Sequence, residues 1–308
     1  MAQISSSKVS GNKKKETLKK DLVAYSMLFP GMLIFLVFVF IPFLQTIVIS
    51  FTDWNGLNAP KFIGLQNYIE LFTSNTSKFY IALKNNLFWM VLGTAVPVII
   101  GIFQANILVG HRIKSSNVWQ MIFFMPQILS VTVTCLIWTW LYEPTNGPIN
   151  AFLDLIGAGF LKSSWLGDPK LVMWSLLGIY IWLTYGFDTV VFCAAIQGVN
   201  PQLYEASTID GCSLRKQFWH ITLPSIRGTL VTTILLQIIS SFKVLDVVFI
   251  TTKGGPGYNS YILSYYAYNE GIQSGRVGYS ASISIALAIL LFSVSMAYNR
   301  AAERIDMQ

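Results

Sequence analysis

Long runs of apolar residues alternate along the chain with shorter polar segments. A hydrocarbon core about 30 Å thick needs about 20 helical residues to cross it, and six of the apolar runs reach that length. They lie near residues 24–50, 86–109, 118–141, 171–195, 229–250 and 280–298. The pattern therefore predicts an all-α polytopic membrane protein with six transmembrane helices.

Proline and glycine interrupt several of these runs, as Pro42, Pro97, Pro126 and Gly186 show. Such residues are tolerated in membrane helices because neighbouring helices satisfy the backbone groups that they leave free. We therefore expect bent helices that pack closely.

The composition agrees with a membrane location. Of 308 residues, 54% are hydrophobic and 11% are charged, with a mean hydropathy of +0.56. These values lie outside the usual range of soluble globular proteins. The three cysteines give an odd count, and two of them, Cys135 and Cys193, lie in apolar runs, so no disulfide framework is indicated. The two histidines and the cysteines have no spacing that suits a metal site.

The distribution of Lys and Arg predicts the orientation. Residues 1–22 form a basic tail, and the apolar stretch that follows is about twice as long as a secretory signal core, so we interpret it as a retained anchor of a permease domain at 23–308. With the N-terminus inside, the inner segments carry 13 basic residues and the outer loops seven. The positive-inside rule then places both termini in the cytoplasm, together with the polar loop at 200–228.

This loop has a helix-turn-helix pattern from Pro201 to Pro224. Asn200 is a good N-cap, and Pro201 suits the first helical position, so a short helix is expected to end near Gly211. Ser213 can cap a second helix. Spacing alone favours the interpretation of an amphipathic connector on the membrane surface.

The loop also contains a sequence motif. Its residues are Glu205, Ala206, Ser207, Asp210 and Gly211, followed by Phe218, Ile221, Leu223 and Pro224. This pattern resembles the EAA loop of binding-protein-dependent ABC importers. In that family the loop is a cytoplasmic helix-turn-helix that docks into a groove of the ATP-hydrolysing subunit. The resemblance therefore implies that these residues couple the chain to an ATPase.

The resemblance covers most of the chain. Within the family, the chain is similar to the carbohydrate-uptake branch, which includes permeases for maltose, lactose and glycerol-3-phosphate. The outer-loop patterns "FIGLQNY" at 62–68, "WLGDP" at 165–169 and "LSYYAY" at 263–268 carry it. The chain departs from the motif at Ser207 and Cys212, where Ala is usual, and at Gly228, where Pro often stands.

The family implies several partners. They are a second homologous permease that forms a heterodimer with this chain, two copies of an ABC ATPase, an extracytoplasmic solute-binding protein and a sugar, in the cytoplasmic membrane of a bacterium or archaeon. The chain has no Gly-Lys dipeptide and so no P-loop. ATP and Mg²⁺ are therefore expected on the partner subunits, with no cofactor in this chain, no catalytic residue and no nucleic acid.

Polar residues within the apolar runs are candidates for a substrate pathway. Sugars are bound by hydrogen bonds to their hydroxyls and by aromatic rings against their C–H faces. The candidates are Gln127, Trp182, Tyr185, Phe187, Gln237, Ser240 and Ser241, and the packing of aromatic side chains is the alternative for each ring.

Three ionisable residues lie within the predicted spans, namely Asp188, Lys243 and Asp246. Such groups in a membrane suggest function by default. For Asp188 we expect either a structural hydrogen bond or a part in gating, and for Lys243 and Asp246 either a mutual salt bridge or a functional role. These charges are too few and scattered for the alternative of a membrane-embedded enzyme. A stand-alone secondary transporter is the other alternative, and the EAA-like loop argues against both.

Overall fold

The structure, a computed structural model, describes residues 25–110 and 113–306. The predicted basic tail at 1–22 lies outside the described residues. Within these described residues, five helical segments are long and apolar enough to cross a membrane: Tyr25–Ile49, Phe79–Gly110, Val172–Gln197, Arg227–Thr251 and Val277–Arg304. A sixth span is present if the bent pair Ser116–Ile128 and Val131–Leu141 is counted as one. The all-α, multi-pass prediction is confirmed.

The bounds of the elements are as follows. The longer helices are α2 (Ile41–Ile49), α4 (Phe79–Ala105), α5 (Ser116–Ile128), α6 (Val131–Leu141), α8 (Val172–Gln197), α12 (Arg227–Phe242) and α15 (Val277–Asp306). The shorter ones are α3 (Gln66–Thr73), α7 (Pro148–Leu155), α9 (Pro201–Ile209), α10 (Leu214–Gln217), α11 (Leu223–Ser225), α13 (Leu245–Thr251) and α14 (Leu263–Tyr268). π-Helical turns occur at η1 (Leu36–Phe40), η2 (Asn106–Gly110), η4 (Phe218–Thr222) and η5 (Asn269–Gln273), and a 3₁₀ turn occurs at η3 (Gly159–Leu161).

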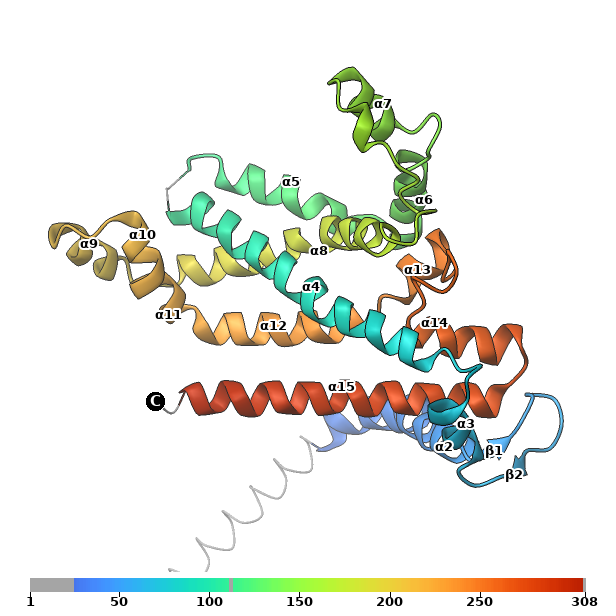
Figure 1. The fold of residues 1–308 in the computed structure, drawn as a ribbon. Helices are drawn as coiled ribbons and strands as arrows, with labels where there is room; N and C mark the ends of the chain where they lie inside the picture. Colours follow the sequence, from blue (N-terminus) through green and yellow to red (C-terminus); the bar gives the residue numbers. More distant parts are fainter. Residues whose placement is uncertain (1–24, 111–112, 307–308) are drawn as a thin grey trace, which may run out of the picture.

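The long helices form a bundle with its connections gathered at two ends. Figure 1 shows α4, α8, α12 and α15 running along the bundle, with α9, α10 and α11 at the end near the C-terminus. At the opposite end lie α3, α14 and two short antiparallel strands, β1 (Thr52–Asp53) and β2 (Lys61–Phe62), which the sequence did not predict. The chain therefore has two distinct polar ends, as a membrane-spanning bundle requires.

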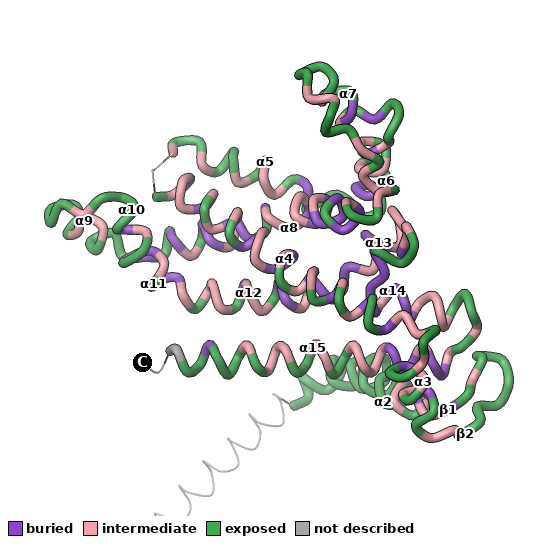
Figure 2. Tube along the Cα trace, viewed as in Figure 1, coloured by how far each residue is buried: buried purple, intermediate pink, exposed green. Residues whose placement is uncertain are grey.

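Helix α8 lies at the centre of the bundle and packs against α4 and α5 (Figure 2). Leu176, Ile179 and Phe192 on α8 are fully buried, as is Trp89 on α4. Lipid is as apolar as these side chains, so close packing rather than escape from water holds such helices together. By contrast, none of the most apolar stretch of Tyr25–Ile49 is buried within the chain.

Glycines permit the closest helix approaches. A Cβ at Gly101 of α4 would lie 2.7 Å from the Cβ of Asp188 on α8. A Cβ at Gly186 of α8 would overlap the carbonyl oxygen of Phe123 on α5. Small residues let membrane helices approach backbone to backbone, which explains two of the glycines that interrupt the apolar runs.

The predicted span at 118–141 is not one continuous helix but a bent pair of helices. Leu129 and Ser130 have extended backbones, with ψ of 145° and 133°, so α5 ends at Ile128 and α6 leaves it at 94°. The predicted span at 229–250 is also interrupted, between α12 and α13, at Lys243 and Val244. Each break leaves backbone groups free of helical hydrogen bonds within an otherwise apolar region.

Candidate functional site

The helix-turn-helix at 201–222 has the predicted helices. The Oδ1 atom of Asn200 accepts a hydrogen bond of 3.0 Å from the backbone N–H of Gln202, and Pro201 occupies the first turn of α9. Asn200 is therefore the N-cap that the sequence predicts. Ser213 occupies the predicted N-cap position of α10, but its side chain makes no capping hydrogen bond. Only the Ser213 carbonyl contributes, by accepting from the N–H of Gln217 at 2.9 Å.

Gly211 closes the first helix in a left-handed conformation, with φ of +74°. Its N–H donates to the carbonyl of Thr208 at 3.1 Å, and the N–H of Cys212 donates to that of Ser207 at 2.9 Å. These two bonds define a Schellman motif, in which glycine avoids the Cβ penalty of the left-handed region. The glycine of the EAA-like motif thus has a defined backbone role.

Hydrogen bonds hold the two helices of the loop together. Tyr204 and Thr222 share a hydroxyl–hydroxyl hydrogen bond of 3.0 Å, and Gln217 Nε2 donates to Thr208 Oγ1 at 3.0 Å. Ile221 packs against the buried cluster at this end of the bundle. The loop is therefore fixed to its own helices along one side.

The other side of the loop is exposed. Glu205, Ala206 and Asp210 are exposed, and the apolar side chain of Ile209 is 86% exposed. Ile209 and the exposed Leu214 line one hollow together with Glu205, and apolar side chains gathered beside an acid on a fixed loop are suited to a protein contact. Of the remaining motif residues, Ser207, Phe218 and Leu223 are half-buried and Pro224 is exposed. The docking role of all these residues stays a prediction.

A buried polar network joins α8 and α12 in the middle of the bundle. Gln237 Nε2 donates to both carboxylate oxygens of Asp188, at 2.8 Å each, and Tyr180 Oη donates to Gln237 Oε1 at 3.2 Å. Asp188 is fully buried, and Gln237 is 5% exposed. Asp188 therefore makes the interhelical hydrogen bond that was one of the two expectations for it, and Gln237 is engaged with a protein partner.

A small cavity lined by both polar and apolar side chains lies where the two helix breaks meet. Its volume is about 150 Å³, and Gln127, Thr184, Ser240, Lys243 and Asp246 supply polar groups to its lining. Two of the predicted pathway residues, Gln127 and Ser240, thus come together there. The expected Lys243–Asp246 salt bridge is wrong, because among residues 25–110 and 113–306 no ion pair of 4.0 Å or less joins them and both side chains are exposed.

The other pathway candidates lie elsewhere. The rings of Trp182 and Trp138 are 6.0 Å apart and nearly perpendicular, and Tyr185 packs against Phe123 at 6.1 Å. Ser241 is buried, and its hydroxyl donates to the carbonyl of Ile238 at 2.7 Å. Phe187 is 37% exposed. The structure therefore does not gather the seven candidates into one site.

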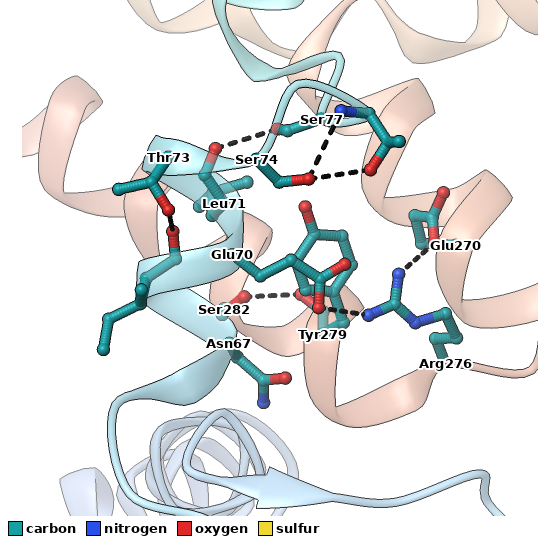
Figure 3. A network of polar contacts seen from close by, with 12 residues as sticks. Asn67, Glu70, Leu71, Thr73, Ser74, Ser77, Glu270, Arg276, Tyr279 and Ser282 are labelled. Carbon is teal, nitrogen blue, oxygen red and sulfur yellow. Dashed lines mark hydrogen bonds and ion pairs between the residues drawn. The ribbon is translucent and has the colours of Figure 1, made fainter.

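A polar network that the sequence did not reveal ties the opposite end together (Figure 3). Arg276 Nη2 lies 2.6 Å from Glu70 on α3, its Nη1 lies 3.5 Å from Glu270, and its guanidinium carbon is 4.2 Å from the centre of the Tyr279 ring. Burial raises the pKa of Glu270, and the positive charge of Arg276 opposes that shift. Glu70 and Arg276 are 206 positions apart, so no local pattern could pair them.

Comparison with known proteins defines the class. The family model described as "Binding-protein-dependent transport system inner membrane component" matches residues 97–306. The chain belongs to this family of membrane subunits, and the family resemblance drawn from the sequence is confirmed.

Particular relatives cover nearly the whole chain. It is 32% identical over 280 residues to the "Probable ABC transporter permease protein YurN" of Bacillus subtilis (strain 168), covering 90% of this chain and 95% of the relative. It is 30% identical over 294 residues to the "Diacetylchitobiose uptake system permease protein NgcF" of Streptomyces coelicolor, covering 90% of this chain and 82% of the relative. It is 28% identical over 277 residues to the "Trehalose/maltose transport system permease protein MalF" of Thermococcus litoralis, covering 90% of this chain and 92% of the relative.

The fold also matches a solved structure. A chain of the bacterial alginate ABC transporter, in complex with an alginate pentasaccharide-bound periplasmic protein, superposes with a TM-score of 0.80 at 24% identity, covering 94% of this chain and 97% of that one. The likeness shows that this chain has the fold of an ABC importer permease.

Proposed function

We propose that this chain is a transmembrane permease subunit of an ATP-driven carbohydrate importer and forms half of its translocation pathway. Family membership supports the transport role, and the names of two relatives refer to saccharides. The structural observation that carries the proposal is the helix-turn-helix at one end of the bundle, which exposes Glu205, Ile209 and Asp210 on a rigid loop.

The proposed orientation puts that loop in the cytoplasm of a bacterial or archaeal cell. The excess of Lys and Arg in the inner segments supports this arrangement, with both termini on the same side. The end of the bundle with β1, β2, α3 and α14 then faces outward, where an extracytoplasmic solute-binding protein would deliver the substrate.

The chain needs partners for energy and for a complete pathway. It carries no P-loop, so two ATPase subunits would bind ATP and Mg²⁺. The helix Tyr25–Ile49 finds little cover within its own chain, which favours a second, homologous permease as its neighbour. A heterodimer of permeases would enclose the substrate between two half-sites.

The cavity at the helix breaks is the proposed half-site, and its polar residues would contact the substrate. The amide of Gln127 and the hydroxyls of Thr184 and Ser240 can exchange hydrogen bonds with sugar hydroxyls. Lys243 and Asp246 add a donor and an acceptor of opposite charge, so the lining has no net charge. Such a set suits a polyhydroxylated, uncharged ligand.

Movement can pass from the loop to this half-site through continuous helices. The segment from α10 through η4 and α11 leads into α12 with only Ile226 between them. Helix α12 carries Gln237, which is bonded to Asp188 of α8. Closure of the ATPase dimer would therefore displace α12 relative to α8 and switch the pathway between inward-facing and outward-facing states.

Reconstitution of the chain with its permease, ATPase and binding-protein partners tests the proposal. We expect ATP-dependent uptake of an oligosaccharide into proteoliposomes and no uptake when the ATPase subunits are omitted. Uptake driven by an ion gradient through this chain alone would instead establish a secondary transporter. Turnover of a lipid or peptide by the purified chain would establish an enzyme.

A further inference from the structure

An apolar groove of about 820 Å³ runs along one face of the bundle. Helix α12 packs against both α4 and α15, and residues of all three helices line the groove. Among them are Ile99, Phe103, Leu230, Ile234 and Ala297, and Phe218, Trp219 and Leu223 close one end. The lining is almost entirely hydrocarbon, which excludes a sugar as its occupant.

The groove matches one leaflet of a bilayer in length. On α4 its lining residues extend from Met90 to Phe103. At 1.5 Å per residue this distance is about 20 Å, compared with about 15 Å for half of the hydrocarbon core. A phospholipid acyl chain can therefore lie along the groove from the end of the bundle to about the middle of the membrane.

Aromatic and basic side chains gather at the end that holds α9 to α11. Trp219 is 56% exposed, and Tyr298 lines the groove while donating a hydrogen bond to the carbonyl of Val231 at 3.2 Å. Trp and Tyr are enriched at the membrane–water boundary, where their rings are buried and their polar atoms reach water. This end of the groove therefore lies at headgroup depth.

Basic residues of α10 and α15 lie near this mouth in helical register but outside the groove lining. Lys216 lies one helical turn before Trp219, and Arg304 lies seven residues after Ala297, so each shares a helix face with a groove residue. Both are exposed, and within residues 25–110 and 113–306 neither takes part in an ion pair. Glu303 is next to Arg304 in the sequence. It lies six residues from Ala297, however, and therefore on a different face of α15 from the groove.

We propose that this groove binds an anionic phospholipid of the inner leaflet, with an acyl chain along α4 and α12 and the phosphate between Lys216 and Arg304. The assignment to the inner leaflet rests on the orientation in the proposed function. The site connects the lipid to η4, the turn that links the loop of the EAA-like motif to α12. Bound lipid would therefore fasten the base of the loop at the membrane surface.

The test uses the whole transporter in nanodiscs that contain equal amounts of phosphatidylglycerol and phosphatidylcholine. After release into detergent, native mass spectrometry gives the ratio of the two lipids retained. Each basic residue near a membrane surface contributes about a fivefold preference for anionic lipid. We expect the Lys216→Gln, Arg304→Gln double variant to lower the ratio by about 25-fold. The matched control is the double variant Lys61→Gln, Lys170→Gln at the opposite end of the bundle. This variant should leave the ratio of the two lipids unchanged.

A second set of variants places a larger side chain in the groove and leaves the charge of the protein unchanged. Ala297→Phe should reduce the phosphatidylglycerol retained, whereas Ala288→Phe, at an exposed alanine of α15 that lines a different apolar groove, should not. An unchanged ratio in the charge variant together with unchanged retention in Ala297→Phe would overturn the proposal.

The strongest competing occupant is an apolar helix of the second permease. A photoreactive benzoylphenylalanine in place of Phe103, an aromatic residue that already lines the groove, should yield an adduct with the mass of a lipid. An adduct with the mass of a subunit would overturn the proposal in favour of that helix. Sugar uptake is scored separately, so a normal importer without lipid preference refutes only the lipid site, and a lipid-binding complex without uptake refutes only the proposed function.

Discussion

Replacing Gly211 by valine tests the coupling loop with little disturbance elsewhere. Gly211 has φ of +74°, and a Cβ placed on it would meet no heavy atom of this chain within 4 Å. The substitution therefore causes no clash within the chain. Its cost comes from holding a β-branched residue in the left-handed region, where Cβ crowds the following carbonyl.

The size of the effect follows from that geometry. A residue other than glycine in the left-handed region costs about 1–2 kcal/mol, and valine falls at the upper end. This cost opposes the Schellman turn, whose bonds run from Gly211 to Thr208 and from Cys212 to Ser207. A shift of this size changes the ratio of native to altered turns by about 5–30-fold.

The assay measures ATP-dependent uptake and complex assembly for four proteins: wild type, Gly211→Ala, Gly211→Val and Gly211→Asn. Asparagine tolerates the left-handed region, so it is the matched control. We expect uptake to fall in the order wild type, Asn, Ala, Val, with a loss of at most about 30-fold for Val. The melting temperature of the membrane bundle should shift by less than about 4 °C, because the turn is exposed and remote from the core.

Two results would refute the reasoning in different ways. Normal uptake by Gly211→Val would show that the loop conformation does not control coupling. Equal losses for Gly211→Asn and Gly211→Val would show that bulk at this position, rather than backbone conformation, is what the partner subunit rejects.

Substitutions at three further positions test the packing and the polar networks. Gly186→Ala should lower the thermal stability of the purified chain by about 1–3 kcal/mol, because the new Cβ would overlap the Phe123 carbonyl, and unchanged melting would contradict the α5–α8 contact. Asp188→Leu should cost about 1–3 kcal/mol by leaving its buried amide partner unpaired, whereas Asp188→Asn should cost less, and equal melting of the two would argue against the bond to α12. Burial raises the pKa of Glu270 above 4.5, so this group favours folding when protonated and that contribution is lost as pH rises through its folded pKa. Glu270→Gln should therefore stabilise the chain at pH 7 relative to wild type and less so near pH 4, and a loss of stability at pH 7 would show that the ion pair with Arg276 outweighs burial.

Sequence reasoning succeeded where the structure depends on neighbours along the chain. The capping by Asn200, the first-turn position of Pro201 and the turn at Gly211 all depend on contacts within a few residues. The spans follow from the length of the apolar runs in the same way. Each of these features is local, so composition and spacing were enough to predict it.

The missed features depend on contacts between distant segments. The α5–α6 corner at Leu129 and Ser130 interrupts a run that reads as one continuous span. The Glu70–Arg276 pair joins α3 to the start of α15, and no periodicity connects them. A single sequence does not specify which distant surfaces meet, and these two features exist only once they do.

The predicted salt bridge between Lys243 and Asp246 does not form, and this outcome bears on function. Residues three apart approach each other only in a continuous helix, but α12 ends at Phe242 and α13 begins at Leu245. Both charges consequently face a cavity rather than each other. A charged side chain at the centre of a membrane helix costs about 2.5–3.5 kcal/mol, and irregular backbone at membrane depth persists only where protein or a water-filled cavity surrounds it. Two helix breaks and two charges that form no ion pair among the described residues surround one cavity, which supports the half-site proposed there.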